Sequence, residues 1–333
     1  KLVSLAFKDA KDAEGTIRLS GRIDGESWSG QGENVGGAPV SWSAKRTAAF
    51  QPEKEEEKAD ELPELGEVIY PFVAYGHSTQ PKAENLLFTN ATVWTNEAAG
   101  ILENADVHIK DGKIVAVGKD LEAKDATTID ATGKHITCGI VDEHSHIAIS
   151  QGVNEWTQAS SAEVSIGHVV NSEDVNLYRQ LSGGVVAAQL LHGSANPIGG
   201  QSAIIKFRWG STPDEMTIDR APGFIKFALG ENVKQSNWGD KNTVRFPQTR
   251  MGVEQVFVDY FTRAKEYEKA WQDYNSLSKR DKRNATPPRR DLELEALAEI
   301  LNSERFISCH SYVQSEVTML MRVAEMFDFR IGI

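Results

Sequence analysis

Residues 138–146, which read Cys-Gly-Ile-Val-Asp-Glu-His-Ser-His, decide how the rest of the sequence is interpreted. An apolar run here ends in two histidines, His144 and His146, one residue apart. Side chains two positions apart in an extended chain point to the same side, so both imidazoles would project from the end of one strand. Neutral imidazole is a good ligand for Zn²⁺. The stretch therefore predicts a metal site at a strand end, although so short a pair also arises by coincidence on protein surfaces.

Downstream of residue 135 the pattern alternates between strands and helices. Apolar strands are expected at 136–141, 184–191, 203–208, 224–229 and 306–308, and amphipathic helices at 253–271, 291–302 and 313–327. Asp291 is a suitable N-cap for the second helix. Strand–helix alternation sustained from 136 to 333 predicts an α/β fold with a parallel sheet. Periodicity does not distinguish an open sheet from a closed barrel.

Three segments of different character precede this part. Residues 1–50 show short alternating stretches and Gly-rich turns, which are typical of strands, and we expect them to be the β-rich tail of an upstream domain. Residues 51–85 are expected to be a linker with a charge run and prolines, and such charge runs usually stay disordered. Residues 86–135 contain several short strands and are expected to form part of a small β-sandwich. Asp111-Gly112 in this segment suits a type I′ hairpin turn, in which both central residues have positive φ.

Composition indicates an ordinary globular chain of 333 residues, with 40% hydrophobic residues, 25% charged residues and a formal net charge of −12. The acidic balance argues against a nucleic-acid partner, because phosphate binding needs clustered Lys and Arg. No apolar run approaches the roughly 20 residues of a membrane span. The two cysteines, Cys138 and Cys309, exclude a disulfide framework. The sequence shows no apolar core of a signal peptide. The compartment stays open, and an exported or periplasmic location is among the alternatives.

The run at 138–146 resembles the signature of the amidohydrolase superfamily, Gly-Ile/Val-x-Asp-x-His-x-His at the end of the first barrel strand. The matching positions are Gly139, Ile140, Asp142, His144 and His146, and Cys138 stands where the family usually has Pro. The resemblance covers roughly residues 86–333 and is greatest to the imidazolonepropionase and prolidase-like branch, with support from 191–202 and 228–234. It implies a (β/α)₈ TIM-like barrel of metal-dependent hydrolases, incomplete in this sequence and occupying 136–333, with a small β-sandwich domain.

The resemblance also implies further ligands. The family has a third histidine at the end of the fifth barrel strand, and His310 fits this position, the alternative being a satisfied core histidine. A carbamylated Lys or a Glu from a middle strand often bridges two metals. Lys226 is slightly favoured over Glu231, which lies just past the strand end. Lys226 is a charged residue among apolar neighbours, and such a residue needs a partner or a modification. His192 ends another strand and is expected either to contact substrate or to pack the Gly-rich loop after it.

Taken together, the resemblance implies a metal-dependent amidohydrolase that cleaves an amide or cyclic amide C–N bond. One or two Zn²⁺ or similar divalent ions would polarise the carbonyl and lower the pKa of a bound water toward about 7. The expected substrate is a small molecule or short peptide. The two specific candidates, an Xaa-Pro dipeptide and an imidazolone-like ring, rest on branch similarity alone.

The family completes its site with a histidine on the sixth strand and an aspartate on the eighth, and a full barrel takes about 250 residues. We therefore expect the catalytic aspartate beyond residue 333. The chain alone is expected to be inactive and to need the remainder of the polypeptide to complete the barrel. Two alternatives stay open: a non-catalytic barrel module of a larger multidomain protein, and a deaminase of the same superfamily.

Overall fold

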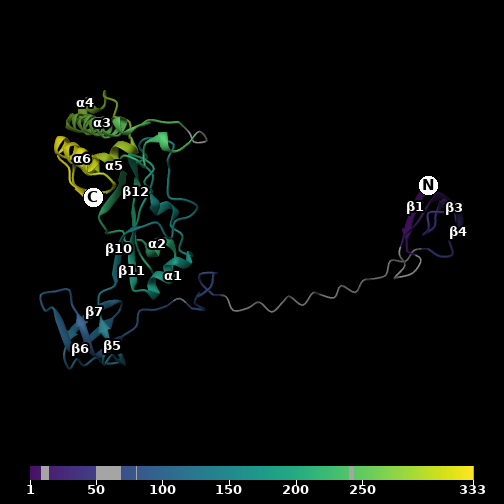
Figure 1. The fold of residues 1–333 in the computed structure, drawn as a ribbon, viewed down its shortest axis with the longest axis horizontal. Coiled ribbons are helices and arrows are strands. Elements are labelled where there is room, and N and C mark those ends of the chain that lie inside the picture. Colours follow the sequence, from purple (N-terminus) through teal and green to yellow (C-terminus); the bar gives the residue numbers. More distant parts are fainter. Residues whose placement is uncertain (9–14, 50–68, 80, 240–243, 333) are drawn as a thin grey trace. The chain divides into compact units, whose positions relative to one another are not determined.

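The computed structural model describes residues 1–8, 15–49, 69–79, 81–239 and 244–332 (Figure 1). The chain divides into two units, Lys1–Gly66 and Glu67–Ile333, and each is considered by itself. The charge run predicted at residues 51–62 lies outside the described residues. None of the described helices is both long enough and apolar enough to cross a membrane.

The first unit contains a four-stranded antiparallel sheet in the order β1-β2-β3-β4. Its strands are β1 (Leu2–Phe7), β2 (Ile17–Asp24), β3 (Ser27–Glu33) and β4 (Pro39–Lys45). Half-buried and exposed positions alternate along β2 and β3, as the two-residue period of a strand dictates. Gly21 pairs with Gly30, and a Cβ on Gly21 would lie 2.6 Å from the Trp42 ring. Glycine at position 21 therefore leaves room for the indole of Trp42 to approach the backbone there.

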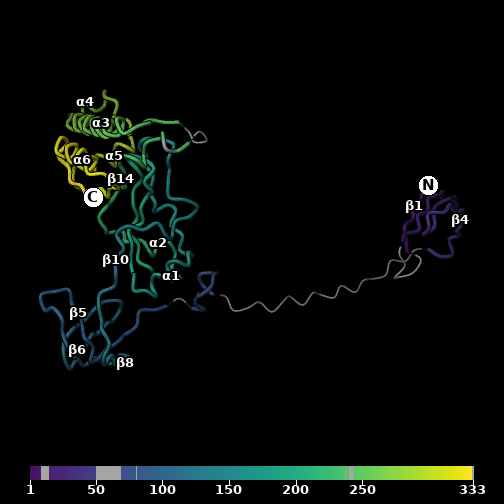
Figure 2. The backbone as a smooth tube through the Cα atoms, viewed as in Figure 1, coloured from purple at the N-terminus to yellow at the C-terminus, as the bar shows by residue number. Residues whose placement is uncertain are grey.

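The second unit begins with a sheet built from β5 (Leu86–Trp94), β6 (Ile101–Lys110), β7 (Lys113–Gly118), β8 (Thr127–Asp130) and β9 (His135–Ile136). The strand order is β7-β6-β5-β8, and β9 also pairs with β5. Asp111 and Gly112 have φ values of 52° and 71° and connect β6 to β7, which confirms the predicted hairpin. The tube in Figure 2 follows the chain from this sheet into β10.

Two further sheets carry the rest of the second unit. One has the order β10-β11-β13, with β10 (Ile140–Ser145), β11 (Val185–Leu190) and β13 (Ala203–Lys206). The other has the order β12-β14-β15-β16, with β12 (Ile198–Gln201), β14 (Gly223–Ala228), β15 (Arg305–His310) and β16 (Ile331–Gly332). The pairs β10–β11, β14–β15 and β15–β16 are parallel. The fold is thus mixed α/β with several sheets.

One strand departs from the predicted parallel arrangement. The strand expected at 203–208 is β13, and it runs antiparallel to β11. Only residues 191–202 separate the two strands, and they include β12. A parallel return usually crosses over through a helix, whereas this connection contains a strand and no helix and brings the chain back antiparallel.

The helices of the second unit are α1 (Val175–Ser182), α2 (Pro213–Met216), α3 (Arg250–Ser276), α4 (Lys279–Lys282), α5 (Leu292–Leu301) and α6 (Gln314–Phe327), with 3₁₀ turns η1 (Ile166–Val169) and η2 (Gln235–Asn237). The three predicted amphipathic helices correspond to α3, α5 and α6, and α3 extends beyond its predicted ends. The Asp291 carboxylate accepts hydrogen bonds from the backbone N–H groups of Glu293 and Leu294, as expected of an N-cap. Figure 1 shows α3, α5 and α6 grouped together, and Figure 2 labels β14 next to α5.

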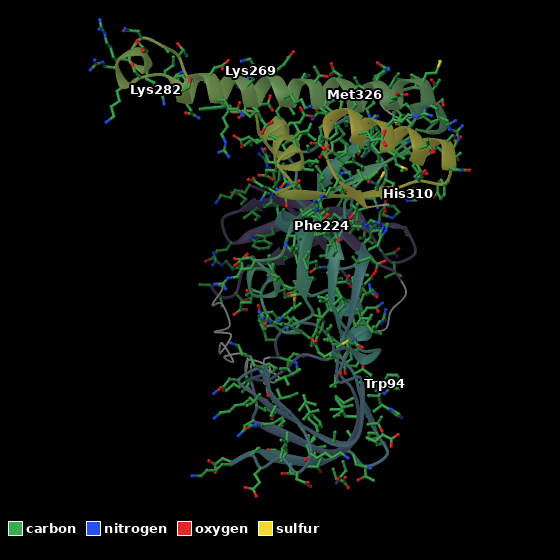
Figure 3. All side chains as sticks on the ribbon, turned by 90° about the vertical axis from the view of Figure 1, so that its left-hand side faces the viewer. Trp94, Phe224, Lys269, Lys282, His310 and Met326 are labelled. Atoms are coloured by element: carbon green, nitrogen blue, oxygen red, sulfur yellow. The ribbon has the colours of Figure 1, made fainter. Side chains whose placement is uncertain are left out.

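The register of β14 and β15 sorts their side chains into two sets. Ile225, Phe227 and Ile307 are at most 1% exposed and belong to the core cluster that also contains buried residues of α3, α5 and α6. The intervening positions pair Lys226 with Ser308 and Ala228 with His310. Because successive side chains in a strand alternate between faces, the helices cover Ile225, Phe227 and Ile307, and Lys226 and Ser308 together line a pocket on the other face. Figure 3 labels Phe224 and His310 near the two ends of these strands.

Candidate active site

The two histidines of the opening motif stand together at the end of β10. Ser145 between them is 6% exposed, whereas both histidines are exposed, as the alternation of a strand requires. Their ring centroids are 5.3 Å apart and the rings are nearly perpendicular. The Nδ1 of His146 donates to the carbonyl oxygen of Leu191 at 2.8 Å. A carbonyl only accepts, so the proton of a neutral ring lies on Nδ1 and the lone pair of Nε2 is available to a ligand.

Lys226 of β14 lies against the same pair. Its Nζ is 3.1 Å from the Nε2 of His144, and the residue is 1% exposed. Burial lowers the pKa of the Lys226 ammonium to about 8. Burial and then the charge of Lys226 lower the pKa of His144 as well. Both groups are thus biased toward their neutral forms, which is the state in which nitrogen atoms bind a metal ion.

His310 ends β15, as predicted for the third histidine. Its Nε2 lies 3.2 Å from the Nδ2 of Asn232, and the Tyr312 ring packs edge-on with a centroid distance of 4.5 Å. Burial and the nearby charge of Lys226 lower the pKa of His310. Within the part of the chain that the structure describes, no three His, Cys, Asp or Glu side chains come close enough together to hold an ion. A ligand role for His310 therefore stays a prediction.

Glu231, the second candidate for a bridging ligand, has a different set of neighbours. Its carboxylate forms ion pairs with Lys234, at 3.0 Å, and with Arg250. The Nε of Arg250 also donates to Glu316 at 2.7 Å. These two basic side chains hold the Glu231 carboxylate, whereas Lys226 lies next to His144. Of the two candidates, the geometry brings Lys226 to the histidine pair.

His192 is 1% exposed and is enclosed by main chain. Its Nε2 accepts from the backbone N–H of Glu155 at 2.7 Å, and its Nδ1 donates to the Gly193 carbonyl at 2.8 Å. A Cβ on Gly199 would lie 2.9 Å from this ring and 2.8 Å from the carbonyl oxygen of Lys226. Both ring nitrogens are therefore used to pack the loop, which is one of the two roles expected for His192, and a contact with substrate stays a prediction.

Sequence reasoning did not single out Gln189 or Asn232. Gln189 of β11 is 7% exposed, and its Nε2 donates to the hydroxyls of Ser202 and Ser308 at 3.4 and 3.2 Å. With His144, Lys226 and Ser308 it lines a pocket of about 370 Å³. A signal for Gln189 exists, because it is the one polar residue within the apolar run 185–191, the same reasoning that pointed to Lys226. Asn232 lies in a loop whose sequence has no such pattern.

Comparisons with known proteins agree on one class. No protein-family model matches the chain. The amidohydrolase tasK of Hapsidospora irregularis is 29% identical over 283 residues, which are 74% of this chain and 28% of that protein. An imidazolonepropionase of Geobacillus kaustophilus is 42% identical over 67 residues, 17% of this chain and 16% of that enzyme. A crystal structure of an amidohydrolase from Thermotoga maritima superposes with a TM-score of 0.65 at 32% identity, covering 74% of this chain and 63% of that chain.

These relatives are hydrolases of the kind that acts on C–N bonds. These likenesses support membership of the chain in the amidohydrolase superfamily. It spans 28% of the length of the fungal relative and 63% of the bacterial structure.

Proposed function

We propose that this chain is part of a metal-dependent amidohydrolase that hydrolyses an amide or cyclic amide C–N bond with the help of an activated water. The observation that carries the proposal is the contact of Lys226 Nζ with His144 Nε2 at 3.1 Å, beside His146 at the end of β10. A buried lysine without a carboxylate ion-pair partner among the described residues is costly unless it has a special role.

The proposed architecture follows from the same strands. The parallel pairs β10–β11, β14–β15 and β15–β16 would be strands of a (β/α)₈ barrel with the histidines and Lys226 facing its interior. The sheet β5–β9 would belong to a small β-sandwich. The likeness to the Thermotoga maritima amidohydrolase supports this arrangement. Active sites of such barrels lie at the carboxyl ends of the strands, where His144, His146 and His310 are located.

Imidazole nitrogens are ligands that suit Zn²⁺ or a similar divalent ion. His144 and His146 would hold it, and His310 would add a third ligand. If a second ion is bound, either Lys226 or Glu231 would bridge the two ions. Lys226 would do so as a carbamate, which its neutral amine forms with carbon dioxide, releasing a proton. When bound, the ion supplies Lewis acidity toward the carbonyl and lowers the pKa of a water. The Leu191 carbonyl fixes the orientation of His146, as metal-binding histidines generally require.

The proposal also covers the substrate and the residues that would complete the barrel. The local match to an imidazolonepropionase supports an imidazolone-like ring, and an Xaa-Pro dipeptide is the other substrate proposed. We further propose that the chain alone is inactive and that residues outside 1–333 supply the general base and complete the barrel.

One observation favours a second candidate, a non-catalytic barrel module of a larger protein. Among the described residues no three His, Cys, Asp or Glu side chains are arranged to hold an ion. A module of this kind would keep the fold and the His144–Lys226 contact without binding metal.

The experiment measures bound metal and product in the complete natural polypeptide. Purified wild type is compared with His144→Ala and with a matched control, His168→Ala, which removes an exposed histidine of η1. We expect one or two Zn²⁺ per chain in the wild type and the control, and loss of metal in His144→Ala. Wild-type protein that remains metal-free after incubation with Zn²⁺ would establish the module instead. Release of ammonia from an aminated ring, without cleavage of an amide, would identify a deaminase.

A further inference from the structure

The loop that follows β14 brings a side-chain amide onto the last ring of β15. The Nδ2 position of Asn232 is 3.2 Å from the Nε2 of His310, across 78 residues of sequence. The two strands are in parallel register up to this point, where Ala228 pairs with His310. The backbone N–H of Leu229 also donates to the His310 carbonyl at 3.0 Å. Asn232 thus reaches the ring from a neighbouring strand end.

The main chain around Asn232 is anchored on both sides. On the C-terminal side, the indole N–H of Trp238 donates to the backbone carbonyl of Asn232 at 3.1 Å. On the N-terminal side, Glu231 is ion-paired with Lys234 and Arg250. Arg250 is in turn bonded to Glu316, which is 8% exposed. The main chain from which the Asn232 side chain projects is therefore held by contacts that do not involve His310.

The contact has chemical consequences, because a neutral imidazole carries one N–H and one lone pair. If the amide nitrogen faces Nε2, that lone pair is consumed and the proton lies on Nδ1, so neither nitrogen can bind a metal. If the amide is turned by half a rotation, its Oδ1 accepts from Nε2–H and the lone pair of Nδ1 is free. The two orientations use the same heavy-atom positions, with oxygen and nitrogen interchanged.

We propose that Asn232 is a positioning residue that selects the tautomer of His310: its Oδ1 faces the ring, holds the proton on Nε2 and leaves Nδ1 as the ligand atom. The inference rests on the proposed function, since it deepens the ligand role given there to His310. The Asn232 Oδ1 would fix the tautomer of His310 as the Leu191 carbonyl fixes that of His146, except that the proton would be on Nε2 instead of Nδ1. His146 and His310 would then each have one oxygen acceptor that fixes the tautomer, the usual arrangement around metal-binding imidazoles.

Three variants of the complete polypeptide test the proposal. Asn232→Asp keeps only acceptor atoms at this position, so it retains the Nε2–H tautomer and binds Zn²⁺ at least as tightly as wild type. Asn232→Leu has a similar size and no polar atom, and we expect its Zn²⁺ affinity to fall by about 10- to 100-fold, as for other lost partners of ligand histidines. Asn284→Leu, at an exposed position of the loop after α4, is the matched control and leaves the affinity unchanged. Zn²⁺ affinity is measured by competition with a chromophoric chelator.

A second readout does not involve metal. Long-range ¹H–¹⁵N spectra of the metal-free protein report which nitrogen of His310 carries the proton, and we expect Nε2–H in the wild type and in Asn232→Asp, and a mixture of tautomers in Asn232→Leu. A wild-type ring protonated on Nδ1, or a folded Asn232→Leu variant that binds Zn²⁺ as tightly as wild type, would overturn the proposal. If the wild type holds the Nε2–H tautomer but binds no Zn²⁺, the proposed function fails while the tautomer selection by Asn232 stands.

Discussion

Replacing Lys226 with Met should stabilise the metal-free protein at neutral pH. Lys226 is 1% exposed, and burial lowers the pKa of its ammonium from 10.5 to about 8. A tenfold change in a protonation equilibrium corresponds to about 1.4 kcal/mol, so holding this lysine protonated in the folded state costs about 3 kcal/mol at pH 7. Met has a similar length and no charge, so the variant should recover a large part of that free energy, about 2 kcal/mol after imperfect packing is allowed for.

The dependence on pH gives the sharper test. Between about pH 8 and 10.5 the folded lysine has released its proton while the unfolded lysine keeps it. The unfolded state therefore binds more protons, and the stability contributed by Lys226 rises with pH in this window. The advantage of Lys226→Met over wild type should be full at pH 7 and should shrink as the pH approaches 10.5.

The assay is urea denaturation followed by tryptophan fluorescence, with a chelator present throughout to keep the protein metal-free. Lys206→Met is the matched control, because Lys206 ends the strand β13 and is exposed; it should leave the free energy of unfolding unchanged within about 0.5 kcal/mol. The reasoning is refuted if Lys226→Met is less stable than wild type at pH 7, or if the difference between them is the same at pH 7 and pH 10.

Two further predictions concern helix α5. Asp291→Ala should lower the free energy of unfolding by about 1 kcal/mol, because it removes the acceptor for the Glu293 and Leu294 N–H groups. Asp291→Asn keeps an acceptor and should stay close to wild type in the same urea titration. Equal losses in both variants would contradict the capping role. Burial, and after it the charge of Glu163, raise the pKa of Glu293 above 4.5, against the opposing effects of Ser160 and Arg263. The folded state then binds the proton more tightly than the unfolded state, so the stability contributed by Glu293 should decline as the pH rises through the range above 4.5. In thermal melts between pH 4 and 7, the stability of Glu293→Gln should therefore decline less than that of the wild type.

Local sequence patterns predicted the parts of the site that depend on one strand at a time. The alternation in 138–146 is enough to put His144 and His146 on one side of β10, and the apolar run before His310 is enough to put that histidine at the end of β15. The Asp111-Gly112 turn was likewise predictable, because positive φ at both positions leaves few alternatives. Each of these features is determined by residues within about ten positions of one another.

Contacts between distant strands could not be read in the same way. Lys226 reaches His144 across 82 residues, and the choice between Lys226 and Glu231 depended on which strand face and which loop the chain presents there. The antiparallel pairing of β13 with β11 goes with a connection that contains β12 and no helix, which periodicity did not show. The enclosure of His192 by the backbone of Glu155 and Gly193 needs a loop conformation that apolar patterning does not encode.

The glycine at position 199 has a consequence for random mutagenesis of this protein. A methyl group there would press at once on the His192 ring and on the carbonyl oxygen of Lys226. A mutation library that randomises β12 would thus press on the strand that carries Lys226, even though position 199 is 27 places away along the chain. Useful diversity is better introduced elsewhere, with Gly199 held constant.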